Sequence, residues 1–415
     1  MRTRSLFLAL GILATACGSA EEPDSASGDN ALTMTGVSPA ERAAYLASAQ
    51  IALTDRVPGF TPEQILKGPP GKNVFALNEE VACDFVEPDI KDQLGGMTPK
   101  FACKLPNGEV VKVKYSRGNN NDEVYSETLA SRLLWSIGLP ADRMYPVRVT
   151  CRNCPVEPWA AYVQTYGTTF NKLRFREPGA RDTRRFEAAA LELKFDAAKI
   201  ARDDGDTGWG WDELPARPAA YWDMNRTQRA AFDGEHPEQV RFDALRLYAA
   251  WAKHADNKAS NQRLVCLKQD VGTDGKCAKP LLMIQDMGIT FGGGTDLGGL
   301  HYEKVAKASL AGWTNQSKSP VWKDFSKCQA SLKGSAWSGT LDHPRVSNVG
   351  RAVLTERLGS LSKEQLTAIF QAARIEEKKE TWTDPATGQE RLVTVDDWVH
   401  GFQTMVGLID KECPE

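Results

Sequence analysis

Residues 251–261 read Trp-Ala-Lys-His-Ala-Asp-Asn-Lys-Ala-Ser-Asn, and residues 281–288 read Leu-Leu-Met-Ile-Gln-Asp-Met-Gly. Together they contain Asp256, Asn261 five positions later, and Asp286, which ends an apolar run. Gly288 permits a sharp backbone turn just after that carboxylate, because glycine adopts conformations that other residues avoid. Asp and Asn also occupy ordinary turns in many proteins, and that alternative stays open for this set.

Oxygen-bearing side chains in this order suit the transfer of a phosphoryl group. The reaction needs oxygen ligands for Mg²⁺ and one carboxylate that accepts the proton of the attacking hydroxyl. We expect Asp256 to be that base, with Asn261 and Asp286 as metal ligands. His254 is expected to orient this loop through a backbone hydrogen bond, and proton transfer by its ring is the alternative.

The start of the chain has the pattern of a secretory signal, which we assign to residues 1–16. A basic Met-Arg-Thr-Arg precedes an apolar run over residues 6–14, which is too short to span a bilayer. Residues 13–17, Leu-Ala-Thr-Ala-Cys, resemble a bacterial lipobox. The resemblance implies that Cys17 is acylated and anchors the protein to an envelope membrane, either at the outer membrane or facing the periplasm. Free secretion is the alternative.

The chain beyond the signal is expected to contain a tether and two packed regions. Residues 17–37 are mostly small and polar, so we expect them to be a disordered tether. A β-rich region is expected within residues 38–168 and a mostly helical one over residues 169–415. The formal net charge is −3 without a long basic run, which disfavours binding of nucleic acid.

Eight cysteines follow Cys17, and an even number behind a secretory signal indicates disulfides. One pair would flank a turn-rich loop, another would be a tight local bridge, and the last two pairs follow by elimination. The expected pairs, in that order, are Cys266–Cys277, Cys151–Cys154, Cys83–Cys103 and Cys328–Cys413. A thioredoxin-type redox role for the Cys-Arg-Asn-Cys sequence is an alternative, whereas the scattered histidines disfavour zinc.

Alternating apolar residues predict strands in the β-rich region. Residues 101–104 and 109–115 would be joined by a Leu-Pro-Asn-Gly hairpin turn, and residues 144–150 and 159–166 would be two more strands. Residues 121–137 have the apolar stripe of a helix.

A glycine-containing turn precedes the first of these strands. Residues 94–100, Leu-Gly-Gly-Met-Thr-Pro-Lys, would cover phosphates with backbone N–H groups, Thr98 and Lys100. A plain turn is the alternative.

Strand 109–115 places Val111 and Val113 on one face and two lysines, Lys112 and Lys114, on the other. These lysines are interpreted either as a solvated face or as part of a site. For a site, we choose Lys114 paired with Glu127 of the following helix, because a strand lysine and a helix glutamate hold nucleotide phosphates together. Lys112 is the second choice.

The second half of the chain is predicted to be mostly helical, over residues 185–202, 237–253, 363–373 and 395–411. Residues 203–212 form an acidic loop with two tryptophans, expected to be solvated apart from the packed rings; Ca²⁺ binding is the alternative. Residues 289–301 are rich in glycine. They suit a mobile lid, a docking loop or a plain linker.

Taken together, residues 94–292 resemble the protein-kinase-like superfamily. The closer likeness is to its atypical branch of phosphatidylinositol kinases, HipA-type kinases and secretory-pathway Golgi kinases. The resemblance implies an α+β, two-lobed fold with a small β-rich lobe and a larger helical lobe. It implies ATP and Mg²⁺ as cofactors. Its implied site is Lys114 as nucleotide lysine, Glu127 as its partner, Asp256 as catalytic carboxylate, and Asn261 and Asp286 as metal ligands.

Two departures from the family pattern are visible. Ala255 replaces the Arg of His-Arg-Asp, and Met287 replaces the Phe of Asp-Phe-Gly. We therefore carry two functional hypotheses. One is an envelope-anchored phosphotransferase that moves a phosphoryl or AMP group to a protein, sugar or lipid. The other is a catalytically inactive, pseudokinase-like binding lipoprotein.

Overall fold

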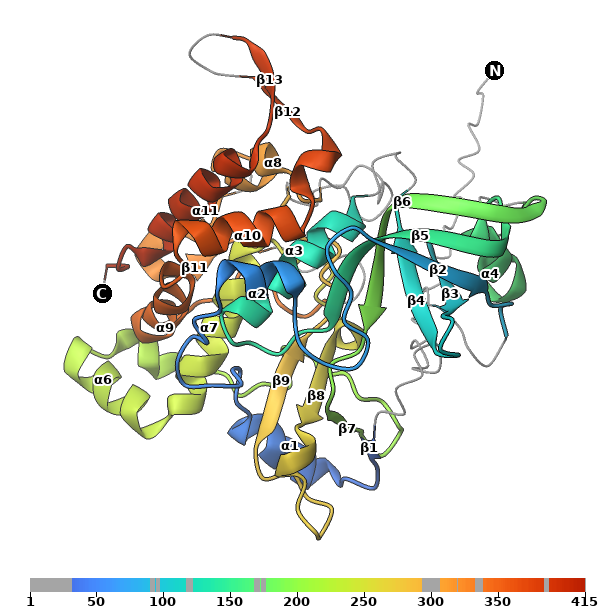
Figure 1. Cartoon of the computed structure of the whole chain (residues 1–415). Helices are drawn as coiled ribbons and strands as arrows, with labels where there is room; N and C mark the ends of the chain where they lie inside the picture. Colours follow the sequence, from blue (N-terminus) through green and yellow to red (C-terminus); the bar gives the residue numbers. More distant parts are fainter. Residues whose placement is uncertain are drawn as a thin grey trace, which may run out of the picture.

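The computed structural model describes residues 32–89, 94, 98–116, 122–167, 172, 177–292, 307–318, 320–332, 339–383 and 388–414. Within this part the protein mixes helices and sheets, as the sequence predicted. Figure 1 shows a group of strands on one side, a group of helices on the other and a small sheet below them.

Five strands close into a barrel in the order β2-β3-β4-β6-β5. They are β2 (Glu79–Phe85), β3 (Lys100–Lys104), β4 (Val110–Tyr115), β5 (Arg143–Pro155) and β6 (Arg181–Leu193). The strands predicted over residues 101–104, 109–115 and 144–150 are thereby confirmed. The predicted hairpin turn between β3 and β4 is also present, with Gly108 at φ +89°, where glycine is unstrained.

Successive side chains of β4 point alternately to the inside and the outside of the barrel. Val111 and Val113 lie in the apolar core of the barrel, so Lys112 and Lys114 project from its outer face. That face is covered, because helix α3 (Glu123–Ser136) packs against β5 and β6. Lys112 is 4% exposed and Lys114 is 2% exposed, so the interpretation of these lysines as a solvated face is wrong.

Residues 159–166 form helix α4 (Pro158–Tyr166), so their prediction as a strand is wrong. Pro158 stands in the first turn, where its fixed φ favours a helix. Trp159, Tyr162 and Val163 are all buried, and their separation of three and four residues is helical. A short apolar run does not distinguish a strand from a helix by periodicity alone.

Residues 185–193 belong to β6 and residues 198–200 are β7 (Ala198–Ile200), so the helix predicted over residues 185–202 is wrong. Ala, Leu and Glu favour helices in isolation. Here, however, β6 pairs with both β4 and β5 and closes the barrel, and tertiary pairing overrides local propensity. The barrel therefore extends past residue 168, where we expected the β-rich region to end.

Helix α7 (Pro237–Trp251) lies within the helical region and confirms the helix predicted over residues 237–253. The other described helices of this region are α6 (Arg226–Glu235), α8 (Leu310–Thr314), α9 (Asn348–Gly359), α10 (Lys363–Ala372) and α11 (Val395–Asp410). Helices α10 and α11 were also predicted, and Ser362 caps α10 as expected.

Two short hairpins and several single turns of helix complete the helical region. The hairpins are β10 (Trp322–Asp324) with β11 (Gln329–Ala330), and β12 (Thr381–Thr383) with β13 (Glu390–Leu392). The 3₁₀ turns among the described residues are η2 (Ala219–Asp223), η3 (Ala259–Asn261), η4 (Lys268–Asp270), η6 (Phe325–Lys327) and η7 (Ile375–Lys378).

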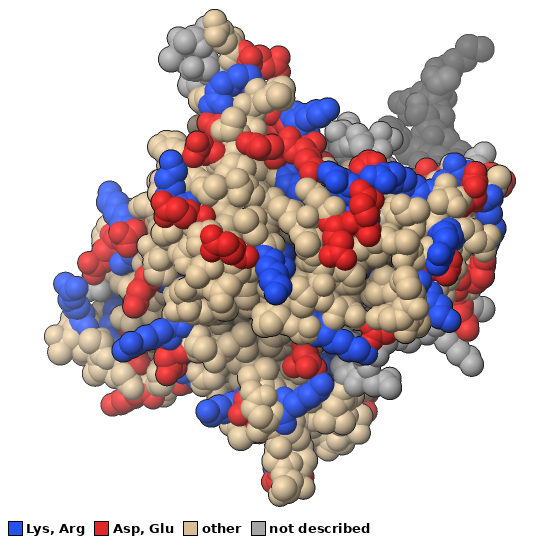
Figure 2. Space-filling model, viewed as in Figure 1, with Lys and Arg blue, Asp and Glu red and all other residues tan. Residues whose placement is uncertain are grey.

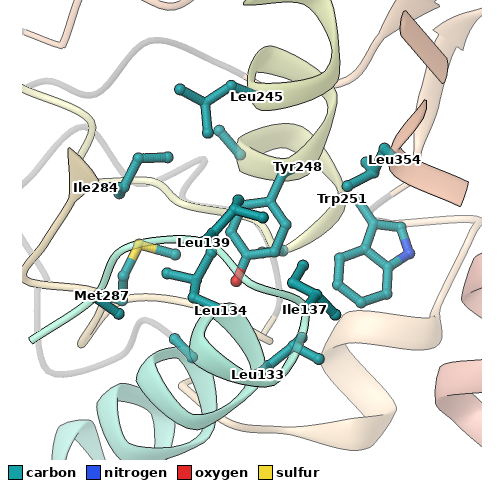
Figure 3. Close-up of a cluster of buried hydrophobic side chains, with 14 of the residues drawn as sticks. Leu133, Leu134, Ile137, Leu139, Leu245, Tyr248, Trp251, Ile284, Met287 and Leu354 are labelled. Carbon is teal, nitrogen blue, oxygen red and sulfur yellow. The ribbon is translucent and has the colours of Figure 1, made fainter. Parts of the chain in front are cut away.

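One apolar cluster joins α3 to α7. Figure 3 shows side chains of both helices meeting beside the end of β9: Leu133, Leu134, Ile137, Leu245, Tyr248, Trp251, Ile284 and Met287. Full burial of one such side chain contributes roughly 1.5–3 kcal/mol to stability. This core therefore fixes α3, α7 and the turn after Ile284 relative to one another.

A second sheet has the order β1-β7-β8-β9, with β1 (Thr33–Met34), β8 (Gln262–Cys266) and β9 (Pro280–Ile284). Strands β8 and β9 are antiparallel and pair Gln262 with Ile284. Asn261 and Gln285 are consequently neighbours, with the Gln285 N–H donating to the Asn261 carbonyl at 2.9 Å.

The N-terminal segment lies against this sheet and against the helices. β1 pairs with β7, so regular structure starts inside the predicted tether 17–37. Beyond it, α1 (Pro39–Ser48) contacts β9 and α2 (Pro62–Lys67) packs on α10. The predicted signal 1–16 and Cys17 lie outside the described residues. None of the described helices is both long enough and apolar enough to cross a membrane.

All four predicted cysteine pairs are disulfides in the structure: Cys83–Cys103, Cys151–Cys154, Cys266–Cys277 and Cys328–Cys413. The first two lie in the apolar core of the barrel. The third closes the loop between β8 and β9, and the last ties the C-terminus to the residue before β11.

Candidate functional site

Lys114 of β4 lies at the centre of a buried group of charges. Its Nζ atom is 2.8 Å from Oε1 and 2.7 Å from Oε2 of Glu127 on α3. The pairing predicted between these two residues is therefore present. Nζ is also 3.6 Å from Oδ1 of Asp286. One ammonium group thus connects the barrel, α3 and the turn after β9.

Glu192 of β6 is a member of this group that sequence reasoning missed. Its carboxylate lies 2.9 Å from Nζ of Lys112, 2.9 Å from Nζ of Lys114 and 2.7 Å from Nζ of Lys194. The signal was the alternation Leu-Glu-Leu over residues 191–193, which was hidden by the assignment of that stretch to a helix.

The two buried glutamates are in different electrostatic states. Burial raises the pKa of Glu127 to about 8, although the ammonium of Lys114 acts against that rise. Burial also disfavours the charged form of Glu192, but the three surrounding lysines outweigh it and hold its pKa well below the usual range. Near neutral pH, Glu192 is therefore the ionised partner and Glu127 is largely protonated.

Helix α7 leads directly into the loop that carries Asp256. Lys253 adopts a left-handed conformation at φ +57° and turns the chain. His254 is buried, and neither ring nitrogen has a hydrogen-bond partner among the described residues. Its backbone N–H donates to the Ala249 carbonyl at 2.8 Å. Burial lowers the pKa of His254 to about 4, so the ring is neutral at physiological pH.

Asp256 is a mostly buried carboxylate with one satisfied oxygen. Oδ2 lies 3.1 Å from Nζ of Lys258, whereas Oδ1 has no hydrogen-bond partner within the described part of the chain. Burial raises the pKa of Asp256, and the nearby Asp286 carboxylate raises it further. Lys258 was also missed, although its place two residues after Asp256 was a visible signal.

Asn261 and Asp286 lie at the adjoining ends of β8 and β9. Nδ2 of Asn261 donates to the backbone carbonyl of Asp256 at 2.7 Å, which leaves the amide oxygen as an acceptor. Asp286 has a left-handed φ of +50°, and its side chain is 39% exposed. This carboxylate is therefore accessible from solvent, in contrast to Glu127 and Glu192.

The turn after Asp286 is tied to the start of α3. The Ser126 hydroxyl donates to the Gly288 carbonyl, and a Cβ at Gly288 would lie 3.1 Å from the Glu123 carboxylate. Glu123 forms a buried ion pair with Lys307, with 2.8 Å between Oε1 and Nζ. These contacts fix the position of α3 relative to Asp286.

The structure describes only some of the residues that were predicted to cover phosphates. Lys100 is paired with Lys114 across β3 and β4, and its Nζ lies 5.9 Å from the centre of the Trp159 ring. Thr98 is buried. Gly95 and Gly96 lie outside the described residues, as do residues 293–301 of the predicted lid or docking loop. Contact of Thr98 or Lys100 with phosphate stays a prediction.

The donors available for a metal are oxygens. Among the described residues, no group of three or more His, Cys, Asp or Glu side chains has the arrangement of a metal site. Two carboxylates, Asp256 and Asp286, together with the Asn261 amide, form a smaller set. Hard oxygen donors of this kind suit Mg²⁺, which keeps several water ligands and needs few protein ones.

A surface cavity of about 450 Å³ lies elsewhere, between η2, α6 and α9. Tyr221, Arg229, Asp233 and Arg351 are among its lining residues, and none of the predicted site residues lines it.

Comparisons with known proteins give only weak similarities, all of them to solved structures. No protein-family model matches the chain, and no curated protein matches its sequence. Among solved structures, the chain is similar to the Helicobacter pylori proinflammatory kinase CtkA, with a TM-score of 0.35 and 11% sequence identity. The match covers 81% of this chain and 95% of that one. A similarity of this size transfers no residue role and no activity.

Proposed function

We propose that this protein is a kinase-like phosphotransferase that uses ATP and Mg²⁺ at the bacterial cell envelope. In this proposal the barrel with α3 is the small lobe of a two-lobed kinase-like arrangement, and the helical region is the large lobe. The observation that carries the proposal is the buried Lys114, which bonds to Glu127 and lies 3.6 Å from Asp286. The acceptor would be a hydroxyl of a protein, sugar or lipid.

The residues fit a Mg·ATP complex chemically. Asp286 is accessible, Asn261 offers an amide oxygen that can act as a ligand, and Oδ1 of Asp256 is buried without a partner among the described residues. A buried carboxylate oxygen without a partner is costly, and a bound hydroxyl would satisfy it. Bound Mg²⁺ would neutralise the β- and γ-phosphates.

Each residue then has a defined task. Lys114 binds phosphate oxygens, while Asn261 and Asp286 hold the metal. Asp256 accepts the proton of the acceptor hydroxyl, and its raised pKa makes it a stronger base than an exposed aspartate. Lys258, 3.1 Å from that carboxylate, adds positive charge where the transferred group passes.

Binding without turnover is the second candidate function. One observation favours it: the His254 ring makes no hydrogen bond within the described residues, so that side chain does not fix the loop that carries Asp256. In this case the protein would be a pseudokinase-like lipoprotein, anchored through acylated Cys17, that holds a partner or ligand. ATP is scarce outside the cytoplasm, and a binding role needs no supply of it for turnover.

The test is thermal unfolding with Mg·ATP, followed by transfer of radiolabelled phosphate. Ligand at 100 times its dissociation constant should add about 2.7 kcal/mol to stability. Asp286→Asn should abolish the part of this stabilisation that depends on Mg²⁺. Asp274→Asn, in the exposed loop between β8 and β9, should leave the stabilisation unchanged. Stabilisation without transfer would support the binding role. Transfer that survives Asp286→Asn would reject the assigned metal site.

A further inference from the structure

Glu192 is surrounded by more positive charge than the helix glutamate that the sequence predicted. Three ammonium groups, from Lys112, Lys114 and Lys194, lie 2.7–2.9 Å from its carboxylate. Its side chain is 3% exposed. A buried carboxylate is stable only when it is paired in this way.

The barrel fixes this arrangement. Leu191 and Leu193 lie in the apolar core, so Glu192 projects from the outer face between them. Across the ladder it pairs with Lys112 of β4 and with Met144 of β5. Backbone hydrogen bonds of two adjacent strands therefore set the distance between Glu192 and the lysines of β4.

Glu127 reaches the same lysine from a separate element. It bonds to Lys114, and the carboxylates of Glu192 and Asp286 both disfavour its ionisation. Asp142 is a further carboxylate of this charged group, with its Oδ2 atom 3.3 Å from Nζ of Lys194. The Glu127 contact depends on the position of α3, whereas the Glu192 contact does not.

We propose that Glu192 is the counter-ion that the barrel itself supplies to Lys114, and the positioning residue that aims this ammonium at nucleotide phosphates. Glu127 is the nearer partner of Lys114, at 2.7 and 2.8 Å, but its contact depends on the placement of α3. The nucleotide part of this inference rests on the proposed function. Glu192 does not itself touch substrate, because its carboxylate is enclosed by lysines.

The direct test compares Glu192→Gln with Glu127→Gln in Mg·ATP kinetics. Glu192→Gln should raise KM for Mg·ATP by at least about tenfold, equivalent to about 1.4 kcal/mol, with a smaller change in kcat. Glu127→Gln should raise KM by less than about threefold. An equal or larger effect of Glu127→Gln would overturn the proposal.

A second variant separates positioning from folding. Glu192→Gln leaves the buried lysines Lys112 and Lys114 and the partly buried Lys194 with one fewer anion. The variant is therefore expected to unfold at a lower urea concentration than the wild type. Lys112→Met combined with Glu192→Gln removes one lysine with the carboxylate and should recover much of that stability. KM should stay raised in the double variant. Recovery of KM together with stability would show a purely structural role and reject the proposal.

Failure of the proposed function can be distinguished from failure of the role assigned to Glu192. If the wild type neither gains stability from Mg·ATP nor transfers phosphate, the proposed function is rejected. The counter-ion assignment is then decided by urea unfolding at pH 7. Glu192→Gln should lower the midpoint clearly and Glu127→Gln should not. Equal midpoints for both variants would reject Glu192 as the residue that holds Lys114 in position.

Discussion

The two ends of β6 carry similar ion pairs in opposite surroundings. At one end, Arg185 lies 2.6 Å from Glu80 and 2.5 Å from Glu187, and all three side chains are at least half exposed. At the other end, Glu192 meets its three lysines in a buried layer under α3. Figure 2 shows basic and acidic side chains interspersed over the surface of the barrel side, where water surrounds them.

The difference shows which ion pairs need a functional explanation. Exposed pairs cost little to form and contribute little, because water and salt screen them. Buried pairs incur a desolvation cost that their attraction often fails to offset, so an apolar layer would usually be as stable. The layer of Lys112, Lys114 and Glu192 is therefore weak evidence for added stability, and it agrees with the binding role proposed for these residues.

The largest effect is expected for Lys114→Met. Loss of this ammonium should reduce phosphate transfer by roughly 100-fold or more, because a preorganised charge at the transferring group is removed. Stability should fall by about 3 kcal/mol, the cost of breaking a buried pair. Transfer assays and urea unfolding measure the two effects. Arg185→Met on the exposed end of β6 is the matched control, and equal losses for both variants would break the comparison.

The next effect is expected for Lys307→Met. It leaves Glu123 buried without its lysine, next to Gly288 and at the first turn of α3. We expect a stability loss of about 3 kcal/mol and roughly a tenfold lower kcat, since α3 and Asp286 lose a shared anchor. Urea unfolding and steady-state kinetics measure both.

An exposed pair of similar geometry provides the control for Lys307. Lys276 lies 3.0 Å from Glu41, and both side chains are exposed. Lys276→Met should change neither stability nor kcat measurably. If Lys307→Met behaves in the same way, the contact between α3 and the Asp286 turn has no part in the site.

The candidate residues that were selected from the sequence are recognised by local spacing along the chain, whereas the residue that was missed depends on non-local strand pairing. Asp256, Asn261 and Asp286 lie within one stretch of the sequence, residues 256–286. Their spacing along the chain was therefore enough to select them as candidates. The strand lysine and helix glutamate, Lys114 and Glu127, also lie close in sequence. Their assigned roles stay predictions, but their proximity follows from local patterns.

Glu192 could not be found in this way, because its partners on β4 are far from it in sequence. Helix propensity over residues 185–202 then favoured the wrong element, and only pairing with both β4 and β5 makes this stretch a strand. The strand predicted over residues 159–166 was wrong for a different reason. Their short apolar run is compatible with either a strand or a helix, and the residues form helix α4. Non-local strand pairing is the information that the sequence lacked.

A smaller effect, with a defined sign, is expected for Glu127→Gln as pH changes. The pKa of Glu127 is about 8 in the folded protein and 4.5 as its ordinary value. Between these values the folded state binds more protons, so this group lowers the free energy of unfolding as pH rises. Glutamine does not titrate. The variant should therefore gain stability relative to wild type from pH 5 to pH 8, by at most about 1.4 kcal/mol per pH unit.

Urea unfolding of both proteins at pH 5, 6.5 and 8 measures this difference. His254 acts in the opposite direction, because its folded pKa of about 4 lies below the ordinary 6.5, but subtraction of the wild type cancels it. A difference that is constant with pH would mean that Glu127 is ionised throughout. Glu127 and Glu192 would then be equal partners of Lys114.

The smallest effect is expected for Arg185→Met, at the exposed end of β6. Its partners Glu80 and Glu187 are solvated with or without it, so unfolding in urea should match the wild type within measurement error. High salt should erase any residual difference, because it screens exposed charges within a few ångströms. A clear loss that persists in high salt would show that the exposed charges also act as a connected network. Burial would then no longer separate the functional ion pairs of this barrel from the ordinary ones.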